Sequence, residues 1–205
     1  MVRVTKDPVE RKQELIDSAE RLFLKKGYEK TSVSDIVKAI NVAQGTFYYH
    51  FFSKSDILEA VIEKNISVLM NKLLNIASQK DVNAPERLNE IINILFRYGT
   101  AKDEVQTYIH QESNIFLYDK IGKMITARLI PILTGVIAAG AAEGRFNISY
   151  PTETAEFLIA ALIYMLHQAD IITANSKRRE RARIAIEQCL IRVLGIKDYK
   201  FKLEL

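Results

Sequence analysis

The stretch of sequence that decides the fold is TSVSDIVKAINVAQGTFYYHFFSKSDIL, residues 31–58. Apolar residues recur in it at helical spacing, which predicts one short helix over residues 33–40 and a second over residues 44–51. Residues 41–43, with the sequence NVA, form a tight turn between the two. Two short helices joined by such a turn are the minimal device for placing the second helix in the major groove of DNA. The stretch therefore predicts a helix-turn-helix.

Capping residues mark the helix starts around this pair. Ser32 and Ser53 each begin an S-x-x-D sequence, the form of a capping box, in which side chains satisfy free amides of the first helical turn. Upstream, Asp7 and Pro8 supply an N-cap and a proline at the first helical position. Three short helices are thus expected within residues 1–53, which we assign to an N-terminal helix-turn-helix domain.

Helical spacing continues through the remainder of the chain, and no segment shows sustained alternation of apolar and polar residues. The fold class is therefore all-α. A long helix is expected from about Lys54 to Ala77. Further helices are expected over residues 85–101, 103–111, 113–143, 151–174 and 177–195. Residues 54–205 are assigned to a second, C-terminal helical domain.

Composition places the chain among ordinary globular proteins. It has 205 residues, of which 48% are hydrophobic, enough to bury a sizeable core. The formal net charge is +4, and the basic excess lies mainly within residues 1–54, where 10 Lys and Arg face 7 Asp and Glu. The longest nearly uninterrupted apolar stretch covers residues 129–142, shorter than the roughly 20 residues that span a bilayer. We therefore expect no transmembrane helix, no membrane partner, no secretory signal and a cytoplasmic protein.

The second short helix offers one face to a groove and the other to the core. Phe47 and Phe51 lie four residues apart and are expected to pack inward. Gln44 could pair with a base edge, Thr46 with a phosphate or a thymine methyl group, and Lys54 with a phosphate. The side chains expected toward the groove and its rims are those of Gln44, Gly45, Thr46, Tyr48, Tyr49 and His50.

Residues 31–58 closely resemble the DNA-binding signature of the TetR family of transcriptional regulators, whose core reads G-T-F-Y-Y-H-F-x-S-K-x-x-[IL]-L. The resemblance covers about residues 9–62. It implies a homodimer in which each N-terminal unit enters one half of a palindromic, double-stranded operator. In that family, DNA is commonly contacted at the positions of Ser32, Ser34, Gln44, Gly45, Thr46, Tyr48, Tyr49, His50 and Lys54.

Two residues depart from the family pattern. Asn41 stands where the family usually has a turn glycine, but asparagine tolerates the left-handed conformation, so the turn should survive. Phe52 replaces a residue that is often basic, which removes one expected contact to the DNA backbone.

The resemblance also implies that residues 54–205 sense a ligand and form the dimer. The last two predicted helices would pack against those of a partner, and the expected interface residues are Phe157, Ala161, Leu162, Met165, Ile186 and Leu190. The single cysteine, Cys189, reads as a small buried side chain. Polar or aromatic residues that interrupt apolar helices are the candidates for an effector site: Phe96, Tyr98, Tyr108, His110, Glu112, Asn114, Phe116, Tyr118, Tyr164 and His167.

An enzyme is the main alternative from another class. The sequence lacks a nucleophile elbow, a zinc-protease motif, a P-loop and a dinucleotide fingerprint, so no catalytic residue, cofactor or metal is expected. The resemblance implies a ligand-responsive regulator, in the first place a repressor, and we expect a small apolar or aromatic effector to release it from DNA. The alternative keeps the same DNA-binding module with a C-terminal domain that responds to a protein partner or to no ligand.

Overall fold

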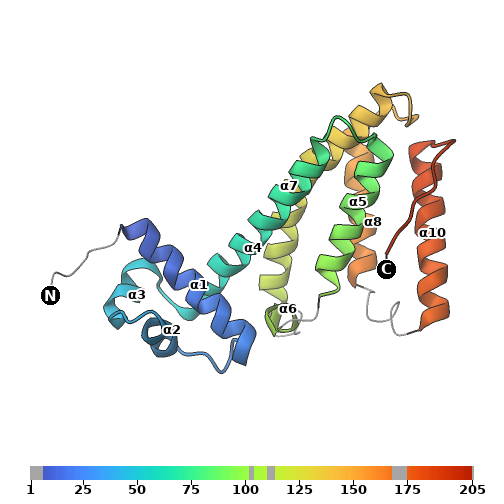
Figure 1. The fold of residues 1–205 in the computed structure, drawn as a ribbon. Coiled ribbons are helices and arrows are strands. Elements are labelled where there is room, and N and C mark those ends of the chain that lie inside the picture. The colour runs from blue at the N-terminus through green and yellow to red at the C-terminus, as the bar shows by residue number, and fades with distance from the viewer. Residues whose placement is uncertain (1–6, 102–103, 110–113, 168–174, 205) are drawn as a thin grey trace. The chain divides into compact units, whose positions relative to one another are not determined.

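The structure is a computed structural model that describes residues 7–101, 104–109, 114–167 and 175–204. Its regular secondary structure consists of helices, and no strand occurs in these ranges (Figure 1). The all-α prediction is therefore confirmed. The α-helices are α1 (Pro8–Lys26), α2 (Val33–Ala39), α3 (Gln44–His50), α4 (Lys54–Ala77), α5 (Ala84–Gly99), α6 (Glu104–Ile109), α7 (Ile115–Ala142), α8 (Pro151–His167) and α10 (Ser176–Leu194).

The chain forms two compact units, and each is built from two separate stretches of the sequence. The first unit comprises residues 1–68 and 102–119, and the second comprises residues 69–101 and 120–205. The first unit thus contains α1, α2, α3 and α6, and both α4 and α7 contribute to the two units. A domain boundary between residues 53 and 54 stays a prediction.

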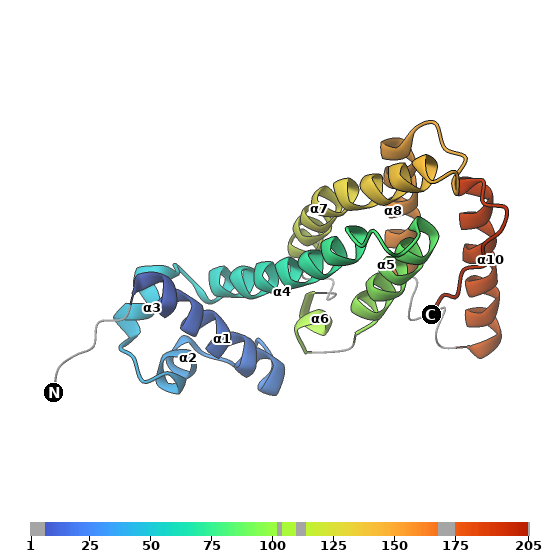
Figure 2. The same ribbon diagram turned by 45° about the horizontal axis from the view of Figure 1, so that its top comes forward.

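The first unit is built around α1, which buries Leu15 and Phe23 completely. Ile36 from α2 and Phe47 from α3 are equally buried, and Figures 1 and 2 show α2 and α3 gathered on α1. The buried Ser18 hydroxyl donates to the Ile36 carbonyl oxygen at 3.0 Å, so the polar group inside this core has a partner. Burying each large side chain stabilises the fold by roughly 1.5–3 kcal/mol, and the buried side chains of this core come from all three helices.

An ion-pair cluster holds the start of α4 to α1. The Lys64 ammonium lies 2.8 Å from an Asp17 oxygen and 2.6 Å from a Glu20 oxygen. The hydrogen bond from Lys64 lowers the pKa of Asp17, and the hydrogen bond to Asp17 raises the pKa of Lys64. The three side chains are partly exposed, so this cluster fixes the position of α4 more than it adds to stability.

The second unit is organised around α5, in which residues 91–96 are all buried. The helix starts at Asn83, whose side chain accepts from the Glu86 amide, and it passes so close to α8 that a Cβ on Gly99 would lie 2.8 Å from Leu166. At its N-terminal end the buried Arg87 pairs with Glu143 at 2.6 Å, where α7 has just ended. Contacts on several sides make α5 the central helix of this unit.

The last turn of α7 requires a glycine at residue 140. A Cβ at Gly140 would lie 2.2 Å from the ring of Phe146, which is itself buried. Any side chain there would displace that ring from the core. Beyond the turn, the Asn147 amide donates to the Leu194 carbonyl oxygen at 2.9 Å, which joins the loop to the end of α10.

Helix α7 combines length with apolar character and continues through Pro131. By length and composition alone, its segment Leu117–Ala142 is apolar enough to cross a membrane, although no uninterrupted apolar run of that length is present because isolated charges such as Arg128 divide it. The core helix of a soluble protein has the same length and composition, and Leu133, Val136 and Ile137 of α7 are buried. The feature is therefore weak evidence for a membrane segment.

Candidate nucleic-acid interface

The first short helix of the pair begins at the capping box that the sequence predicted. The Ser32 hydroxyl accepts from the Asp35 amide at 3.1 Å, and the Asp35 carboxylate accepts from the Ser32 amide at 2.9 Å. Lys26, in the last turn of α1, pairs with the same carboxylate at 2.8 Å. The Lys26 hydrogen bond and those from Ser32 hold the pKa of Asp35 far below its usual range. Ser32 therefore fixes the start of α2, in addition to any contact with DNA.

The turn between α2 and α3 has the predicted conformation. Asn41 has a φ of 55°, in the left-handed region, so asparagine does take the place of the usual glycine. The Val42 amide then donates to the Val37 carbonyl oxygen at 3.0 Å. Phe47 and Phe51 are buried as expected and anchor α3 in the core of the first unit.

With its aromatic anchor buried, α3 exposes a different set of side chains. Gln44 and Gly45 are exposed, and a Cβ on Gly45 would meet open space, so a DNA backbone could approach there closely. Tyr49 is 75% exposed, the most of any aromatic residue within α3. Tyr48 is also exposed, whereas Thr46, His50 and Ser34 are half-buried. Contact of these side chains with DNA stays a prediction.

The segment between α3 and α4 closes with a modified capping box. The Ser53 hydroxyl accepts from the Asp56 amide at 3.1 Å, but the Asp56 carboxylate accepts from the Phe52 amide, at 3.0 Å. This arrangement fixes the Phe52 backbone and leaves its side chain 93% exposed. An apolar ring is thus held in water beside α3, at the position where the family often has a basic residue.

Lys54 is engaged within the protein. Its ammonium donates to the carbonyl oxygens of Tyr28 and Glu29 at 3.0 and 3.4 Å, and lies 4.1 Å from the centre of the Tyr28 ring. An ammonium has three N–H groups, so these two bonds leave one for a phosphate. The sequence predicted the phosphate contact alone, because a bond to two backbone carbonyls some 25 residues away has no local signature.

Two basic residues of α1 that we did not select stand beside α3. The Lys12 ammonium lies 5.5 Å from the centre of the Phe51 ring, and Arg11 pairs with Glu14 at 2.6 Å. Burial, followed by the charges of Lys12 and Arg11, lowers the pKa of His50. Basic residues near the N-terminus of a helix oppose the helix dipole, and the unfavourable placement of Arg11 in the first turn, with Lys12 directly after it, is the signal that could have identified them.

The candidates for an effector site divide between the two units. Tyr108 and Asn114 lie in the first unit, where the Asn114 side chain donates to the Tyr108 carbonyl oxygen at 2.7 Å. Phe96 is buried in the second unit, and Tyr164 is 63% exposed there. Tyr98, in the second unit, and Tyr118, in the first, are half-buried. Four predictions lie outside the described residues: His110 and Glu112 entirely, and Phe116 and His167 in their side chains.

The residues expected at the dimer interface divide by burial. Leu162 and Leu190 are buried within the single chain, so they belong to the core of the second unit. Phe157 is 60% exposed, Ala161 is exposed, and Met165 and Ile186 are half-buried. The prediction of a buried cysteine is wrong: Cys189 is exposed, because it lies on the side of α10 opposite to Leu194.

Comparison with known proteins identifies both parts of the chain. Residues 15–61 match the family described as bacterial regulatory proteins, tetR family, and residues 99–184 match the tetracyclin repressor-like C-terminal domain. The biofilm-operon negative transcriptional regulator IcaR of Staphylococcus aureus is 30% identical over 87 residues, 42% of this chain and 45% of that protein. The chain spans less than half the length of the curated relatives that it matches.

Solved structures share the fold over nearly the whole chain. A TetR/AcrR regulator from Thermobifida fusca superposes with a TM-score of 0.63 at 24% identity, covering 91% of this chain and 97% of that one. RolR, in complex with its ligand resorcinol, superposes with a TM-score of 0.65 at 18% identity, covering 93% and 90%. At these identities the likeness concerns the fold alone, but the two matching family domains together cover more than half of the sequence. The chain therefore belongs to the TetR family of bacterial regulatory proteins.

Proposed function

We propose that this protein is a transcriptional regulator that binds a palindromic operator as a homodimer, represses transcription, and is released by a small apolar or aromatic effector. One observation carries the DNA-binding part of the proposal. Helix α3 is anchored by the buried Phe47 and leaves Gln44, Gly45 and Tyr49 exposed. A rigid helix with a polar exposed face is what reading base edges in a major groove requires.

The side chains around α3 suggest separate roles. Gln44 stands at the first turn, where a carboxamide can pair with an adenine edge. Lys12 and the remaining N–H of Lys54 supply positive charge for phosphates on the flanks, and the exposed hydroxyls of Tyr48 and Tyr49 can donate to phosphate oxygens. These contacts make affinity depend on salt, because each neutralised phosphate releases counterions.

The dimer proposal rests on exposed stripes in the second unit. On α8, Phe157, Ala160, Ala161 and Tyr164 are exposed at positions one helical turn apart, and small residues between two aromatic ones allow close approach. On α10, Ile184, Ala185, Gln188 and Cys189 form a similar exposed stripe. An isologous contact of these stripes with those of a second copy would bury apolar surface and provide the two-fold axis that a palindrome needs.

The effector proposal is supported by the aromatic residues and by one solved relative. RolR, which shares the fold, binds the aromatic molecule resorcinol. In this chain, α6 contacts α1, so a change at α6 has a direct route to the DNA-binding helices. Any such coupling is reciprocal. Operator DNA must therefore lower the affinity of the protein for the effector by the same factor by which the effector lowers its affinity for DNA.

The experiment measures binding of the protein to a fluorescent duplex across a series of salt concentrations. We expect log affinity to fall linearly with log salt, with a slope of about −0.9 for each phosphate neutralised. An affinity that does not change with salt would remove the DNA-binding proposal. Adding aromatic metabolites to the same assay tests whether they release the protein from DNA. If none of them does and a protein partner does, the alternative is favoured, in which the C-terminal domain responds to a protein.

A further inference from the structure

After a bend at residues 197 and 198, the last described residues of the chain, 199–204, lie against two helices of the second unit. Ile196, Phe201 and Leu203 are buried, whereas Lys202 and Glu204 are exposed. Burial alternates along residues 201–204, as it does in a β-strand, although no strand partner is present among the described residues. We call residues 200–204 the strap.

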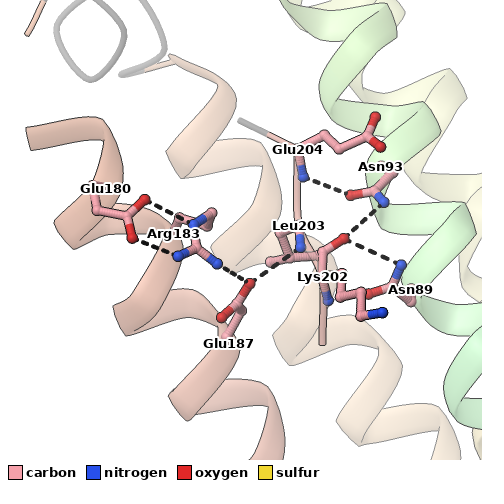
Figure 3. Close-up of polar contacts among 8 residues, drawn as sticks. All are labelled: Asn89, Asn93, Glu180, Arg183, Glu187, Lys202, Leu203 and Glu204. Atoms are coloured by element: carbon pink, nitrogen blue, oxygen red, sulfur yellow. Dashed lines mark hydrogen bonds and ion pairs between the residues drawn. The ribbon is translucent and has the colours of Figure 1, made fainter. Parts of the chain in front are cut away.

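Helix side chains take the place of the missing strand partner (Figure 3). The Asn89 side chain accepts from the Lys202 amide at 2.7 Å and donates to the Lys202 carbonyl oxygen at 3.3 Å. The Asn93 side chain donates to the same carbonyl at 3.0 Å and accepts from the Glu204 amide at 3.0 Å. Because Asn89 and Asn93 are one turn apart on α5, they present their amides in line along the strap.

The opposite side of the strap is read by α10. Glu187, buried in the second unit, accepts from the Leu203 amide at 3.1 Å. Arg183 holds this carboxylate at 2.7 Å and also bonds Glu180, as Figure 3 shows. The amides of residues 202 and 204 thus donate to side chains of α5, and the amide of residue 203 between them donates to a side chain of α10. We call Asn89, Asn93 and Glu187 the clamp.

The clamp recognises a peptide backbone. Every polar contact from the clamp to the strap goes to a main-chain N–H or C=O group, and any residue supplies these groups except that proline lacks the N–H. Phe201 and Leu203, two residues apart, are the apolar anchors. The ligand that this arrangement fits is therefore an extended peptide with an apolar-x-apolar sequence.

The clamp also needs an occupant. Asn93 is only 3% exposed, and an unpaired buried amide or carboxylate is costly. The strap itself is short, and its outer side makes one surface ion pair, between Glu204 and Arg97 at 2.8 Å. The strap has no hydrogen bonds of a helix of its own, so it can leave the clamp as one short segment and is expected to open before the helices around it unfold.

We propose that α5 and α10 form a binding site for an extended peptide, that the strap occupies this site as a tethered ligand, and that the site accepts the same segment from a second molecule. The peptide contacts both helices, α5 through Asn89 and Asn93 and α10 through Glu187. Occupancy therefore sets the position of α10 against α5. The proposal is independent of DNA and effector binding, so its failure leaves the proposed function untouched.

The test uses the full chain with the strap disabled. In the double variant Phe201→Ser, Leu203→Ser, the anchors are lost and the clamp is vacated. A fluorescent peptide with the sequence of residues 197–205 should then bind, as measured by anisotropy, and should bind the wild-type chain far more weakly because the strap competes. Adding Asn93→Ala, which removes two hydrogen bonds, should weaken the peptide about tenfold. Asn75→Ala, at an exposed position of α4, should change nothing.

A peptide carrying serine at the positions of Phe201 and Leu203 is the control ligand and should not bind. The proposal is overturned if the folded double variant fails to bind the wild-type peptide, or if Asn93→Ala and Asn75→Ala behave alike. Should the double variant not fold, hydrogen exchange on the wild-type chain decides. Amides 202–204 should exchange faster than those of α5, and exchange at a common rate would show that the strap is part of the core and overturn the proposal.

Discussion

The rings of Tyr28 and Tyr108 pack together with their centroids 4.3 Å apart, although 80 residues separate them in the sequence. The Tyr28 ring also contacts Phe23 of α1 edge to face. The Lys54 ammonium lies 4.1 Å from the centre of the same Tyr28 ring. Burial raises the pKa of Tyr28 to about 12, so the ring stays neutral. The pair therefore connects α6 with the residues that hold the start of α4.

Removing one ring of this pair should weaken the connection. Tyr108→Ala should lower the free energy of unfolding by more than about 1 kcal/mol, since an aromatic pair contributes about 0.5–1.5 kcal/mol beyond its buried area, and the buried area of the half-buried ring is lost as well. It should also reduce the factor by which an effector weakens DNA, because α6 loses its contact with Tyr28. Chemical denaturation and DNA titrations with and without effector measure the two effects. Tyr108→Phe keeps the ring and removes only the hydroxyl that hydrogen-bonds with Tyr28, so it should lose less than Tyr108→Ala, and equal losses in both variants would contradict this role.

Gln44 and Lys12 should affect DNA binding in different ways. Gln44→Ala should cost about 1–3 kcal/mol on the operator and little on random DNA, because a base contact is lost. Lys12→Ala should weaken all sequences alike and make the salt slope shallower by about 1. Titrations of each variant on operator and random duplexes measure both. If the two variants lose affinity in the same pattern, the division between base and phosphate contacts is wrong.

Operator affinity should rise as the pH falls through the range in which His50 titrates. Burial, Lys12 and Arg11 lower the pKa of His50, so the free protein holds a neutral imidazole at pH 7. A phosphate beside the ring would favour the charged form and raise its pKa in the complex, so binding takes up a proton. The gain begins below the bound pKa and is complete below the free pKa. His50→Gln should remove this dependence, and an unchanged pH profile would show that His50 does not face a phosphate.

The same shift has an opposite effect on folding. Because the pKa of His50 is lower in the folded chain than in the unfolded chain, protonation favours unfolding as the pH drops below about 6.5. Denaturation at each pH separates this loss of stability from the gain in DNA affinity.

Phe157 and Leu162 should separate dimerisation from folding. Phe157→Glu places a charge on an exposed position of α8 and should give a folded monomer, whereas Leu162→Glu buries a charge and should unfold the second unit. Light scattering and circular dichroism distinguish the two outcomes. The Cys189 thiol should also react faster with a maleimide in the Phe157→Glu variant than in wild type. Thr152→Glu, at an exposed position outside the stripe, is the control, and a Phe157→Glu protein that remains dimeric would contradict the proposed interface.

Local features were predicted well from the sequence because their causes are local. Pro8, the capping box at Ser32 and the left-handed Asn41 all act within a few residues, and the structure contains each as expected. The inward positions of Phe47 and Phe51 follow from helical spacing alone.

The remaining features depend on contacts between distant parts of the chain. Helical periodicity predicted that the apolar face carrying Leu162 is covered. It could not say whether the core of the subunit or a partner covers that face, since both require apolar residues. The strap has no helical pattern, and its partners Asn89 and Asn93 are more than 100 residues away. For the same reason, the bonds from Lys54 to the loop after α1 could not be predicted.

Selection of binding sites from random double-stranded DNA tests the central claim most directly. The account predicts that the enriched sequences share two half-sites related by a two-fold axis, and that Gln44→Ala protein enriches the same spacing with a relaxed base preference in each half. Enrichment of a single asymmetric site would contradict the homodimer. Recovery of no sequence above background would contradict the assignment of α3 as the reader of an operator.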